Sequence, residues 1–352
     1  MKILAINPGS TSTKMGIFED DKITFEHTIR HNKDELKDFE KAIEQKEFRS
    51  EAIKAFLNEN DIKLSDFAAI AGRGAPIKSL ESGIYRVNEK MLHDLYHEVK
   101  ADHPSILGAI IANDIAKDAK VPAFIVDPVS VDEFEEVARI SGIPEIPRVS
   151  LSHALNMKAV AKRFERDENM IYEDNNLIIC HLGGGFSITA HKKGKMIDVN
   201  NANDDGPFSP ERSGGLPSGQ LAKICYSGKY SNARELLNYL TKKAGVSAYL
   251  DSNNISELVK RMNEPEVKRI LDAMIYQIAK EIGKMATVLK GNVNYIVITG
   301  GIAYNKCLMD DIADYTEWIA PIKVYPGEDE LLALSEGVKG VLEGKREEKE
   351  YV

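Results

Sequence analysis

The sequence has few cysteines and no long apolar run, and both absences narrow its class. Its three cysteines, Cys180, Cys225 and Cys307, are far apart and show no metal-ligand spacing, which indicates a reducing compartment. No apolar segment approaches the roughly 20 residues that cross a bilayer. The apolar run at the N-terminus breaks at Asn7, too early for a signal peptide. We therefore expect a soluble, cytoplasmic protein with no membrane partner.

An excess of basic residues is also missing. The 46 Lys and Arg residues are outnumbered by 55 Asp and Glu residues, which leaves a net charge of −9. A broad nucleic-acid surface needs a basic face, so we expect no nucleic-acid partner, although local basic pockets are compatible with this balance. The length of 352 residues is about twice that of a typical domain and predicts two domains.

The same succession of strands and turns occurs in both halves of the chain. Residues 2–28 form the pattern strand, hydroxyl-rich turn, strand, short turn, strand, and residues 176–200 repeat it with a glycine-rich turn. A third strand and turn, residues 294–306, lead into a helix. This repeat predicts a duplicated fold with two phosphate-facing hairpins opposed across a cleft. Because the pattern of strand, glycine turn and strand is common, an accidental likeness is the alternative.

The remaining apolar patterns predict further elements. Helical patterns cover residues 33–60, 89–100, 105–117 and 330–344, and strands cover residues 67–76 and 123–129. No low-complexity linker separates the halves, and residues 128–150 are the best candidate for the domain boundary. The charged tail, residues 345–352, is expected to be solvated.

The opening turn, NPGSTSTK, has the composition of an anion-binding turn. Four consecutive hydroxyl side chains, residues 10–13, lie between Asn7 and Lys14. Hydroxyl groups, backbone N–H groups and a lysine in one tight turn can surround a phosphate. The turn is not a Walker A loop, which needs a second glycine before the lysine and a helix after it. An ordinary hydroxyl-rich hairpin turn is the alternative.

The second half carries loops rich in glycine and an arginine. Three successive glycines, residues 183–185, occupy the matching turn and would let a polyphosphate approach the backbone, although a β-bulge or hairpin would explain them equally well. The stretch from Asn201 to Arg212 begins like an EF-hand loop, but Arg212 stands at the twelfth position, where calcium needs a glutamate. Calcium is thereby excluded. Arg212 becomes a candidate anion clamp, with an ordinary surface arginine as the alternative.

Further candidates lie where predicted strands end and helices begin. Arg73 ends a strand between two glycines, and Asp127 ends another, where a carboxylate can position a metal. His103 and His153 lie near predicted helix starts, and either would by itself be a structural residue. An acidic cluster covers residues 328–330, although acidic helix starts are common.

Together these motifs resemble those of the acetate and butyrate kinases, a family within the sugar kinase, actin and Hsp70 superfamily. ILAINPGSTSTK and CHLGGGFSI resemble the family's two signatures, and AGRG, DHPS, VDPV, SLSHA, ERSG, TGGIA and GEDEL follow in the family's order. The likeness spans nearly the whole chain. The length, Gly184 where acetate kinases carry Asn, and GIAYN where they carry GIGEN favour the butyrate kinase branch.

The resemblance implies an α/β protein with a duplicated ribonuclease H-like (actin-like ATPase) fold, whose two mixed-sheet domains flank a nucleotide cleft. Residues 1–150, completed by a C-terminal helix over residues 331–352, would bind the acid, and residues 151–330 would bind the nucleotide. ATP or ADP and Mg²⁺ would serve a reversible phosphorylation of a small-molecule carboxylate, butyrate first, with isobutyrate, propionate or acetate as alternatives. A homodimer or higher homo-oligomer is also implied.

Carried over by position, the resemblance implies roles for the candidate residues. Those assigned to catalysis are Arg73, Arg212, His153, Asp127 and Lys14. Those assigned to the acid are Arg73, His103 and Arg212. Those assigned to the nucleotide and its phosphates are Asn7, Ser10, Ser12, Lys14, Gly183, Gly184, Gly185, Gly300, Gly301 and Ala303. Those assigned to magnesium are Asn7, Asp127 and Glu330, with Asp329 as the alternative to Glu330.

A carboxylate acceptor accounts for the number of cationic candidates. With a pKa of about 4.3 it is already ionised at neutral pH and needs no base, but it must approach another anion. Two unit charges about 4 Å apart repel by about 4 kcal/mol at an effective dielectric constant of about 20. Arg73, Arg212, His153 and Lys14 would offset this repulsion. Two alternatives stay open: a hydroxyl-directed kinase with Asp127 as its base, and a non-catalytic, ATP-switched binding protein.

Overall fold

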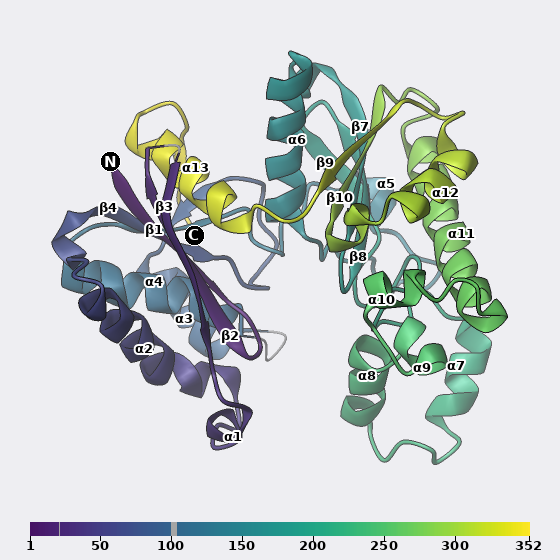
Figure 1. Cartoon of the computed structure of the whole chain (residues 1–352), viewed down its shortest axis with the longest axis horizontal. Helices are drawn as coiled ribbons and strands as arrows, with labels where there is room; N and C mark the ends of the chain where they lie inside the picture. Colours follow the sequence, from purple (N-terminus) through teal and green to yellow (C-terminus); the bar gives the residue numbers. More distant parts are fainter. Residues whose placement is uncertain (21, 100–103) are drawn as a thin grey trace. The chain divides into compact units, whose positions relative to one another are not determined.

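The computed structural model describes residues 1–20, 22–99 and 104–352 and divides into two compact units (Figure 1). The first unit comprises Met1–Val131, Ala154–Ala159 and Asp329–Val352, and the second comprises Asp132–His153 and Val160–Glu328. None of the helices in the described ranges is long and apolar enough to cross a membrane. The assignment of residues 1–150 to the acid and of residues 151–330 to the nucleotide stays a prediction.

The first unit is built on a mixed sheet of seven strands. In spatial order they are β12 (Glu348–Lys349), β5 (Ile84–Arg86), β6 (Ala123–Val126), β4 (Phe67–Arg73), β1 (Lys2–Pro8), β2 (Ser12–Glu19) and β3 (Lys22–Arg30). The first three predicted strands form an antiparallel meander of β1, β2 and β3, and β1 is parallel to β4, which is parallel to β6.

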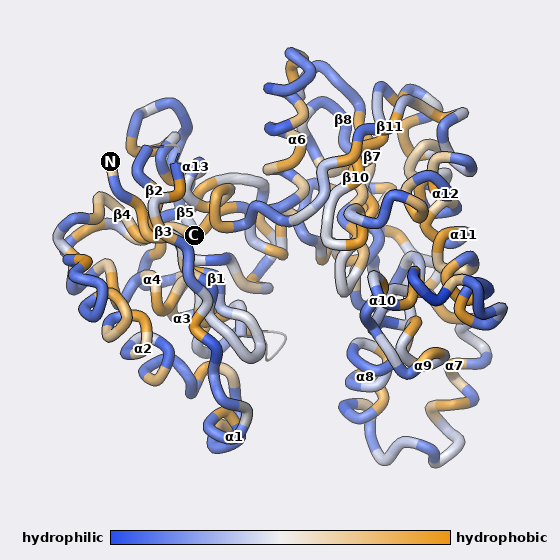
Figure 2. The backbone as a smooth tube through the Cα atoms, in the orientation of Figure 1, coloured by the Kyte–Doolittle hydropathy of each residue, from blue (hydrophilic) through white to orange (hydrophobic). Residues whose placement is uncertain are grey.

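Helices cover both faces of this sheet, so β1 is apolar on both sides. Its Leu4 and Ile6 pack with the helices α2 (Lys46–Glu59), α3 (Glu89–His97) and α4 (Ile106–Ala119). Its Ile3 and Ala5 pack with α13 (Glu330–Leu342). Alternate residues of a strand point to opposite faces, which is why a strand covered on both faces reads as one continuous apolar run. Figure 2 shows such hydrophobic segments along the strands of the sheet.

Two expected helices of this unit differ from the prediction. The helical pattern over residues 33–60 is broken into α1 (Lys33–Leu36), a short 3₁₀ helix (Ala42–Gln45) and α2. The C-terminal helix expected over residues 331–352 ends at Leu342.

The charged tail is not simply solvated. Its strand β12 pairs with β5, and Glu348 accepts hydrogen bonds of 2.6 and 2.8 Å from the guanidinium of Arg86. Tyr351 is 1% exposed and donates a hydrogen bond of 2.8 Å to Asp94 Oδ2, while Asn88 Nδ2 donates one of 2.8 Å to the carbonyl of Tyr351. The composition of the tail predicted a solvated segment because the partners of these charged and aromatic side chains lie about 260 positions earlier in the chain.

The second unit repeats the strand order of the first. In spatial order its five strands are β11 (Ile322–Pro326), β10 (Tyr295–Gly300), β7 (Asn176–Leu182), β8 (Phe186–Lys192) and β9 (Lys195–Val199). β7, β8 and β9 form an antiparallel meander, and β7 is parallel to β10, which is parallel to β11. The arrangement matches β6-β4-β1-β2-β3, which confirms the predicted duplicated α/β fold.

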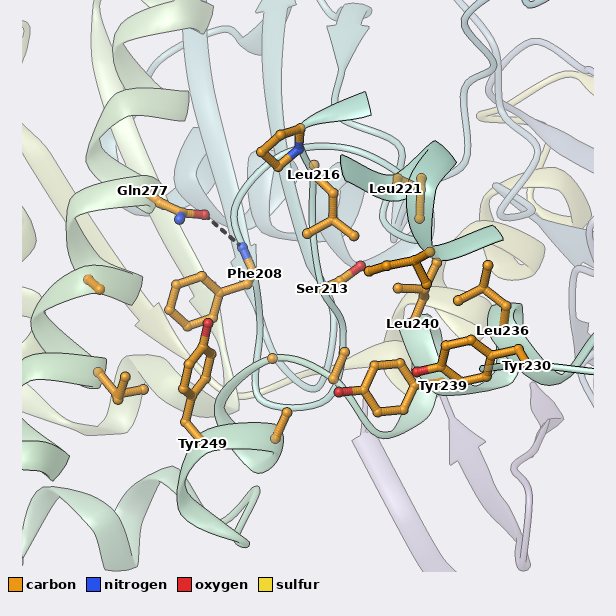
Figure 3. Close-up of a pocket in the computed structure, with 18 of the residues that line it drawn as sticks. Phe208, Ser213, Leu216, Leu221, Tyr230, Leu236, Tyr239, Leu240, Tyr249 and Gln277 are labelled. Carbon is orange, nitrogen blue, oxygen red and sulfur yellow. Dashed lines mark hydrogen bonds between the residues drawn. The ribbon is translucent and has the colours of Figure 1, made fainter. Parts of the chain in front are cut away.

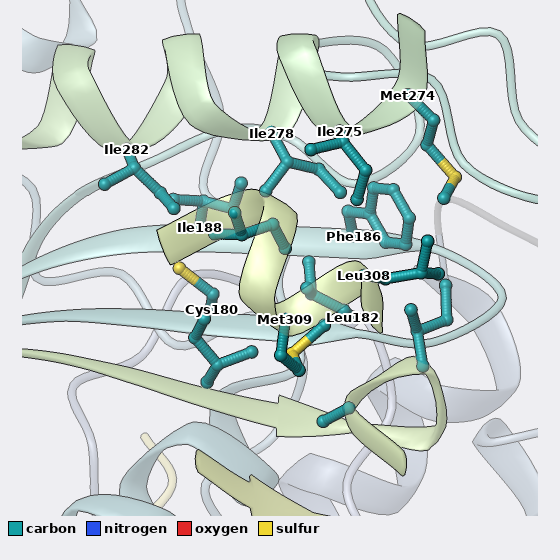
Figure 4. Packing of buried hydrophobic residues seen from close by; sticks show 14 of the residues in the cluster. Cys180, Leu182, Phe186, Ile188, Met274, Ile275, Ile278, Ile282, Leu308 and Met309 are labelled. Carbon is teal, nitrogen blue, oxygen red and sulfur yellow. The ribbon is translucent and has the colours of Figure 1, made fainter. Parts of the chain in front are cut away.

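Helices that the sequence analysis did not anticipate fill the segment between β9 and β10. They are α7 (Ser218–Cys225), α8 (Ala233–Lys242), α9 (Val246–Leu250), α10 (Ile255–Val259) and α11 (Pro265–Val288). Outside this segment lie α5 (Glu136–Arg139), α6 (Ala154–Glu168) and α12 (Lys306–Thr316). α11 packs Ile275, Ile278 and Ile282, spaced three and four residues apart, against Cys180 and Ile188 of the sheet (Figure 4).

Candidate functional site

Three predicted site residues of the first unit lie where neighbouring parallel strands end, at the same edge of the sheet. Ile6 of β1 pairs with Gly72 of β4, and Arg73 of β4 pairs with Val126 of β6. Asn7, Arg73 and Asp127 are therefore carried to the carboxyl ends of β1, β4 and β6. In open α/β sheets this edge is where ligands bind.

Asn7, Arg73 and Glu330 form a hydrogen-bonded group. Glu330, the first residue of α13, accepts a hydrogen bond at Oε2 from Asn7 Nδ2 and a second, of 2.9 Å, from Arg73 Nη1. Arg73 Nη1 also lies 3.3 Å from Asn7 Oδ1. Asn7 and Glu330 are both buried, whereas the Arg73 side chain is 22% exposed. The group thus combines an anion, a cation and an amide, and the choice between Glu330 and Asp329 for magnesium stays a prediction.

Close packing of α4 on β4 fixes the backbone at Arg73. A Cβ atom added to Gly72 would lie 2.2 Å from the carbonyl oxygen of Gly108, and one added to Gly108 would lie 2.2 Å from the carbonyl oxygen of Arg73. Real Cβ contacts are not this short, so only glycine fits at either position. These glycines hold the end of β4 in place.

Asp127 supports a neighbouring loop. Its Oδ1 accepts hydrogen bonds from Ser82 Oγ at 2.7 Å and from the backbone N–H of Gly83 at 2.8 Å. Its own backbone has a φ of 38°, in the left-handed region, and its N–H donates to the carbonyl of Gly83 at 3.0 Å. Two donors on one carboxylate oxygen fix the side chain and weaken the alternative in which Asp127 is a general base.

The opening turn presents its predicted phosphate ligands outward. Ser10 and Lys14 are exposed and Ser12 is half-buried, whereas Thr13 is buried. Asn7 and Lys14 are direct partners across the β1–β2 hairpin. His103 lies outside the described residues, and its predicted role stays untested.

In the second unit the triple-glycine turn lies directly on Arg212. Leu182 pairs with Phe186, so residues 183–185 form the turn between β7 and β8. A Cβ atom on Gly185 would lie 2.6 Å from Arg212 Cζ, whereas one on Gly184 would meet nothing within 4 Å. Arg212 Nη1 donates a hydrogen bond of 2.9 Å to the carbonyl of Ala202. Burial lowers the pKa of the Arg212 guanidinium, which nevertheless stays protonated at neutral pH.

His153 lies at the start of α6 and belongs to a second polar group. Its Nδ1 is 2.9 Å from Ser187 Oγ, and its ring stacks on that of His181 with centroids 3.9 Å apart. His181 is 1% exposed, and its Nε2 lies 3.3 Å from Glu328 Oε1. Neither His181 nor Glu328 is among the predicted site residues, although both lie within sequence motifs that contain predicted site residues.

A cavity of about 270 Å³ opens beside the triple-glycine turn. Gly183, Gly184 and Gly301 of the predicted nucleotide residues line it. Glu211 and Asn253, which hydrogen-bond to each other, also line it and were missed, because polar loop residues far apart in the sequence carry no local signal.

Gly300 and Ala303 do not line this cavity. A Cβ atom on Gly300, whose φ is 95°, would lie 2.4 Å from the carbonyl oxygen of Leu182. Ala303 is 4% exposed and belongs to the hydrophobic core of the unit. The two residues therefore pack within the unit and are not among those that line the cavity.

A larger, mostly apolar cavity of about 740 Å³ lies among α7, α8, α9 and α11 (Figure 3). Leu221, Tyr239 and Tyr249 line it. Gln277, a neutral side chain that also lines it, accepts a hydrogen bond of 3.2 Å from the N–H of Phe208. None of the predicted site residues that the structure describes lines this cavity. Among the described residues, no group of three or more His, Cys, Asp or Glu side chains could hold a metal ion.

The chain is similar to known proteins along nearly its whole length. The profile of the Acetokinase family matches residues 148–316. Butyrate kinase 2 of Clostridium acetobutylicum is 51% identical over 353 residues, which cover 99% of both chains. A probable butyrate kinase of Clostridium botulinum is 48% identical, again over 99% of both chains.

A solved structure of similar fold is the acetate kinase of Porphyromonas gingivalis. It superposes with a TM-score of 0.80 at 16% sequence identity, covering 97% of this chain and 99% of the other. This similarity confirms the predicted actin-like ATPase fold. Identity of about half over nearly the full length shows more than fold: the chain belongs to the acetate and butyrate kinase family.

Proposed function

We propose that this protein transfers the terminal phosphoryl group of ATP to a short-chain carboxylate, butyrate first, and forms an acyl phosphate and ADP reversibly. The observation that carries the proposal is the 51% identity, over 99% of both chains, with a protein named butyrate kinase 2. The protein would work in the cytoplasm, and as a homodimer or higher homo-oligomer.

The reaction needs neutralised charge more than it needs a base. A carboxylate oxygen forms a bond to the γ-phosphorus while the bond to the bridging oxygen breaks, and the electron pair of that bond leaves with ADP. No proton has to move, so the protein's task is positioning and electrostatic stabilisation. The ionised acceptor also removes the need for Asp127 as a base.

We assign Arg73 and Arg212 to the carboxylate and the transferring phosphoryl group. Both guanidiniums are partly buried, where charge is screened less than in water. Their planar forks suit carboxylate and phosphate oxygens alike. His153 is assigned to donate to the phosphoryl group, with Ser187 and the stacked His181 orienting its ring.

We assign the nucleotide to the glycine turn and the cavity beside it. The open space at Gly184 lets a phosphate approach the backbone, and the cavity lined by Gly301 would take the adenosine. Asn7, Ser10, Ser12 and Lys14 are assigned to phosphate oxygens on the first unit, where hydroxyl and ammonium groups are exposed.

The residues assigned to magnesium fit that ion. Magnesium takes oxygen ligands and needs only one or two carboxylates in addition to phosphate. Asn7 and Glu330 place an amide and a carboxylate in direct contact, and Asp127 adds a carboxylate at the same sheet edge. These three residues would hold the ion. When bound, magnesium neutralises charge on the phosphate oxygens.

A substrate panel tests the proposal. The protein is mixed with ATP, hydroxylamine and each of butyrate, isobutyrate, valerate, propionate and acetate, and acyl hydroxamate is measured. We expect product with butyrate at the highest kcat/KM, and a decline of about 10-fold to 200-fold for each methylene that the pocket does not accommodate. A polyol phosphate does not react with hydroxylamine, so polyols are tested separately by ADP release; ADP formed with a polyol and with none of the acids would establish a hydroxyl-directed kinase instead. Tight ATP binding without transfer to any acid would establish a non-catalytic protein.

A further inference from the structure

A fully buried arginine lies behind the hydroxyl-rich turn. Arg49, on α2, is 0% exposed. Its Nη1 donates to the carbonyl of Ser12 at 2.9 Å and to Thr13 Oγ1 at 3.0 Å, and its Nη2 donates to the carbonyl of Ser10 at 3.1 Å. Its Nε and Nη2 also donate to Gln45 Oε1, at 3.0 and 2.8 Å. A single side chain therefore ties α2 to the turn.

These bonds set the direction in which the turn faces. The carbonyls of Ser10 and Ser12 point inward to Arg49, and the carbonyl of Thr11 accepts a hydrogen bond of 3.0 Å from the N–H of His31. With the carbonyl oxygens occupied on the inside, the side chains of Ser10 and Thr11 are left exposed. The turn thus presents donors, and no row of carbonyl oxygens, to an approaching anion.

The charge of Arg49 has no anionic partner within the described ranges. All its acceptors are two backbone carbonyls, one hydroxyl and one amide, which are neutral. A buried charge is costly unless it is balanced. Burial, and then the charge of Arg49, lowers the pKa of the neighbouring His31 to about 4, so His31 is neutral at neutral pH and Arg49 carries the positive charge of this pair. The region behind the turn is therefore positive.

We propose that Arg49 is a positioning residue for the phosphate end of the nucleotide. It holds the turn of residues 10–13 with its donors outward, and its positive charge is balanced by the phosphates that the turn binds. The proposal rests on the proposed function of this turn, and it adds a residue that never touches the ligand.

The substitution Gln45→Glu separates charge from structure. It places a carboxylate where an amide oxygen now accepts two hydrogen bonds from Arg49, so all bonds to the turn are kept while the charge is neutralised. We expect the thermal midpoint to be kept or raised, ATP to bind about tenfold more weakly by calorimetry, and adenosine to bind as before. Asn58→Asp, an equal charge change at an exposed position of α2, is the control and should leave both affinities unchanged.

Two variants of Arg49 itself complete the test. Arg49→Lys keeps the charge and loses most of the bonds, and Arg49→Met loses both. We expect Arg49→Lys to retain ATP affinity at least about tenfold better than Arg49→Met. Unchanged ATP affinity in Gln45→Glu, equal losses for ATP and adenosine, or equal losses in the two Arg49 variants would each overturn the proposal. If the unaltered protein bound no ATP, the proposed function itself would fail, which this comparison distinguishes.

Discussion

At the scale of single residues, the two arginines assigned to the reaction differ in the partners that lose a hydrogen bond or an ion pair when the arginine is replaced. Arg212 donates to one backbone carbonyl, so Arg212→Ala should lower kcat by at least about 10³-fold with the thermal midpoint nearly unchanged. Arg269→Ala, at a side chain 73% exposed on α11, is the matched control and should keep normal turnover in the hydroxamate assay. Near-normal turnover of the Arg212 variant would remove Arg212 from the site.

Arg73 has a structural partner as well. Arg73→Ala leaves the buried carboxylate of Glu330 without its cation, so we expect both at least a 100-fold loss of kcat and a loss of about 3 kcal/mol in the free energy of unfolding. Adding Glu330→Gln should restore most of that stability and none of the activity. Urea unfolding together with the hydroxamate assay measures both quantities, and full recovery of activity in the double variant would contradict the assignment.

His31 makes the stability of the first unit depend on pH. Burial and the charge of Arg49 lower its pKa from 6.5 to about 4 in the folded protein. The unfolded chain therefore binds the extra proton between these pH values, and the free energy of unfolding should fall as the pH is lowered from about 6.5 to about 4. His31→Gln should remove this slope, whereas His97→Gln, at an exposed histidine, should keep it. Urea titrations at several pH values measure the slope. Equal slopes in the two variants would show that His31 is not the source of the pH dependence.

At the scale of elements, two helical glycines should respond in opposite ways to the same change. Gly108→Ala would drive a methyl group into the backbone of β4, 2.2 Å from a carbonyl oxygen, and should cost several kcal/mol or displace Arg73 and abolish activity. Gly283→Ala, on α11 with nothing within 4 Å, should stabilise the protein by about 0.5–1 kcal/mol. Similar urea midpoints for the two variants would show that α4 can move away from β4.

The C-terminal strand should contribute measurable stability. Tyr351→Phe leaves the buried carboxylate of Asp94 without one donor, and we expect a loss of about 1–3 kcal/mol in the free energy of unfolding. Tyr226→Phe, at a side chain 92% exposed, should change it by less than about 0.5 kcal/mol. Chemical denaturation of both variants gives the comparison, and a neutral Tyr351→Phe would mean that the tail is dispensable.

At the scale of the whole molecule, the family resemblance predicts assembly. We expect light scattering to give a mass of at least twice the 39.1 kDa of one chain in dilute buffer. A mass of one chain that stays constant up to the concentration of the activity assay, with full activity, would show that a single copy suffices.

Much of the fold was predictable because its signals are local. The meanders of residues 2–28 and 176–200, the strand ending at Arg73 and the helix near residue 330 are all present where apolar periodicity predicts them. Local pattern failed for β12, which has two residues and forms only because β5 offers it a partner. It also missed the helices between β9 and β10, of which α9, α10 and α11 contribute buried residues to one core cluster.

The candidate site divides in the same way. Neighbouring residues in the chain suffice to recognise the hydroxyl-rich turn, the triple glycine and the strand-end Arg73 and Asp127, and these motifs predict the family. Three contacts follow only from tertiary packing: Glu330 meets Asn7 and Arg73, which lie 323 and 257 positions earlier in the chain, His181 stacks on His153, and Arg49 lies behind the opening turn. The physical reason is that a motif is encoded by neighbours in the chain, whereas the partner of a buried charge is chosen by packing between elements far apart in it.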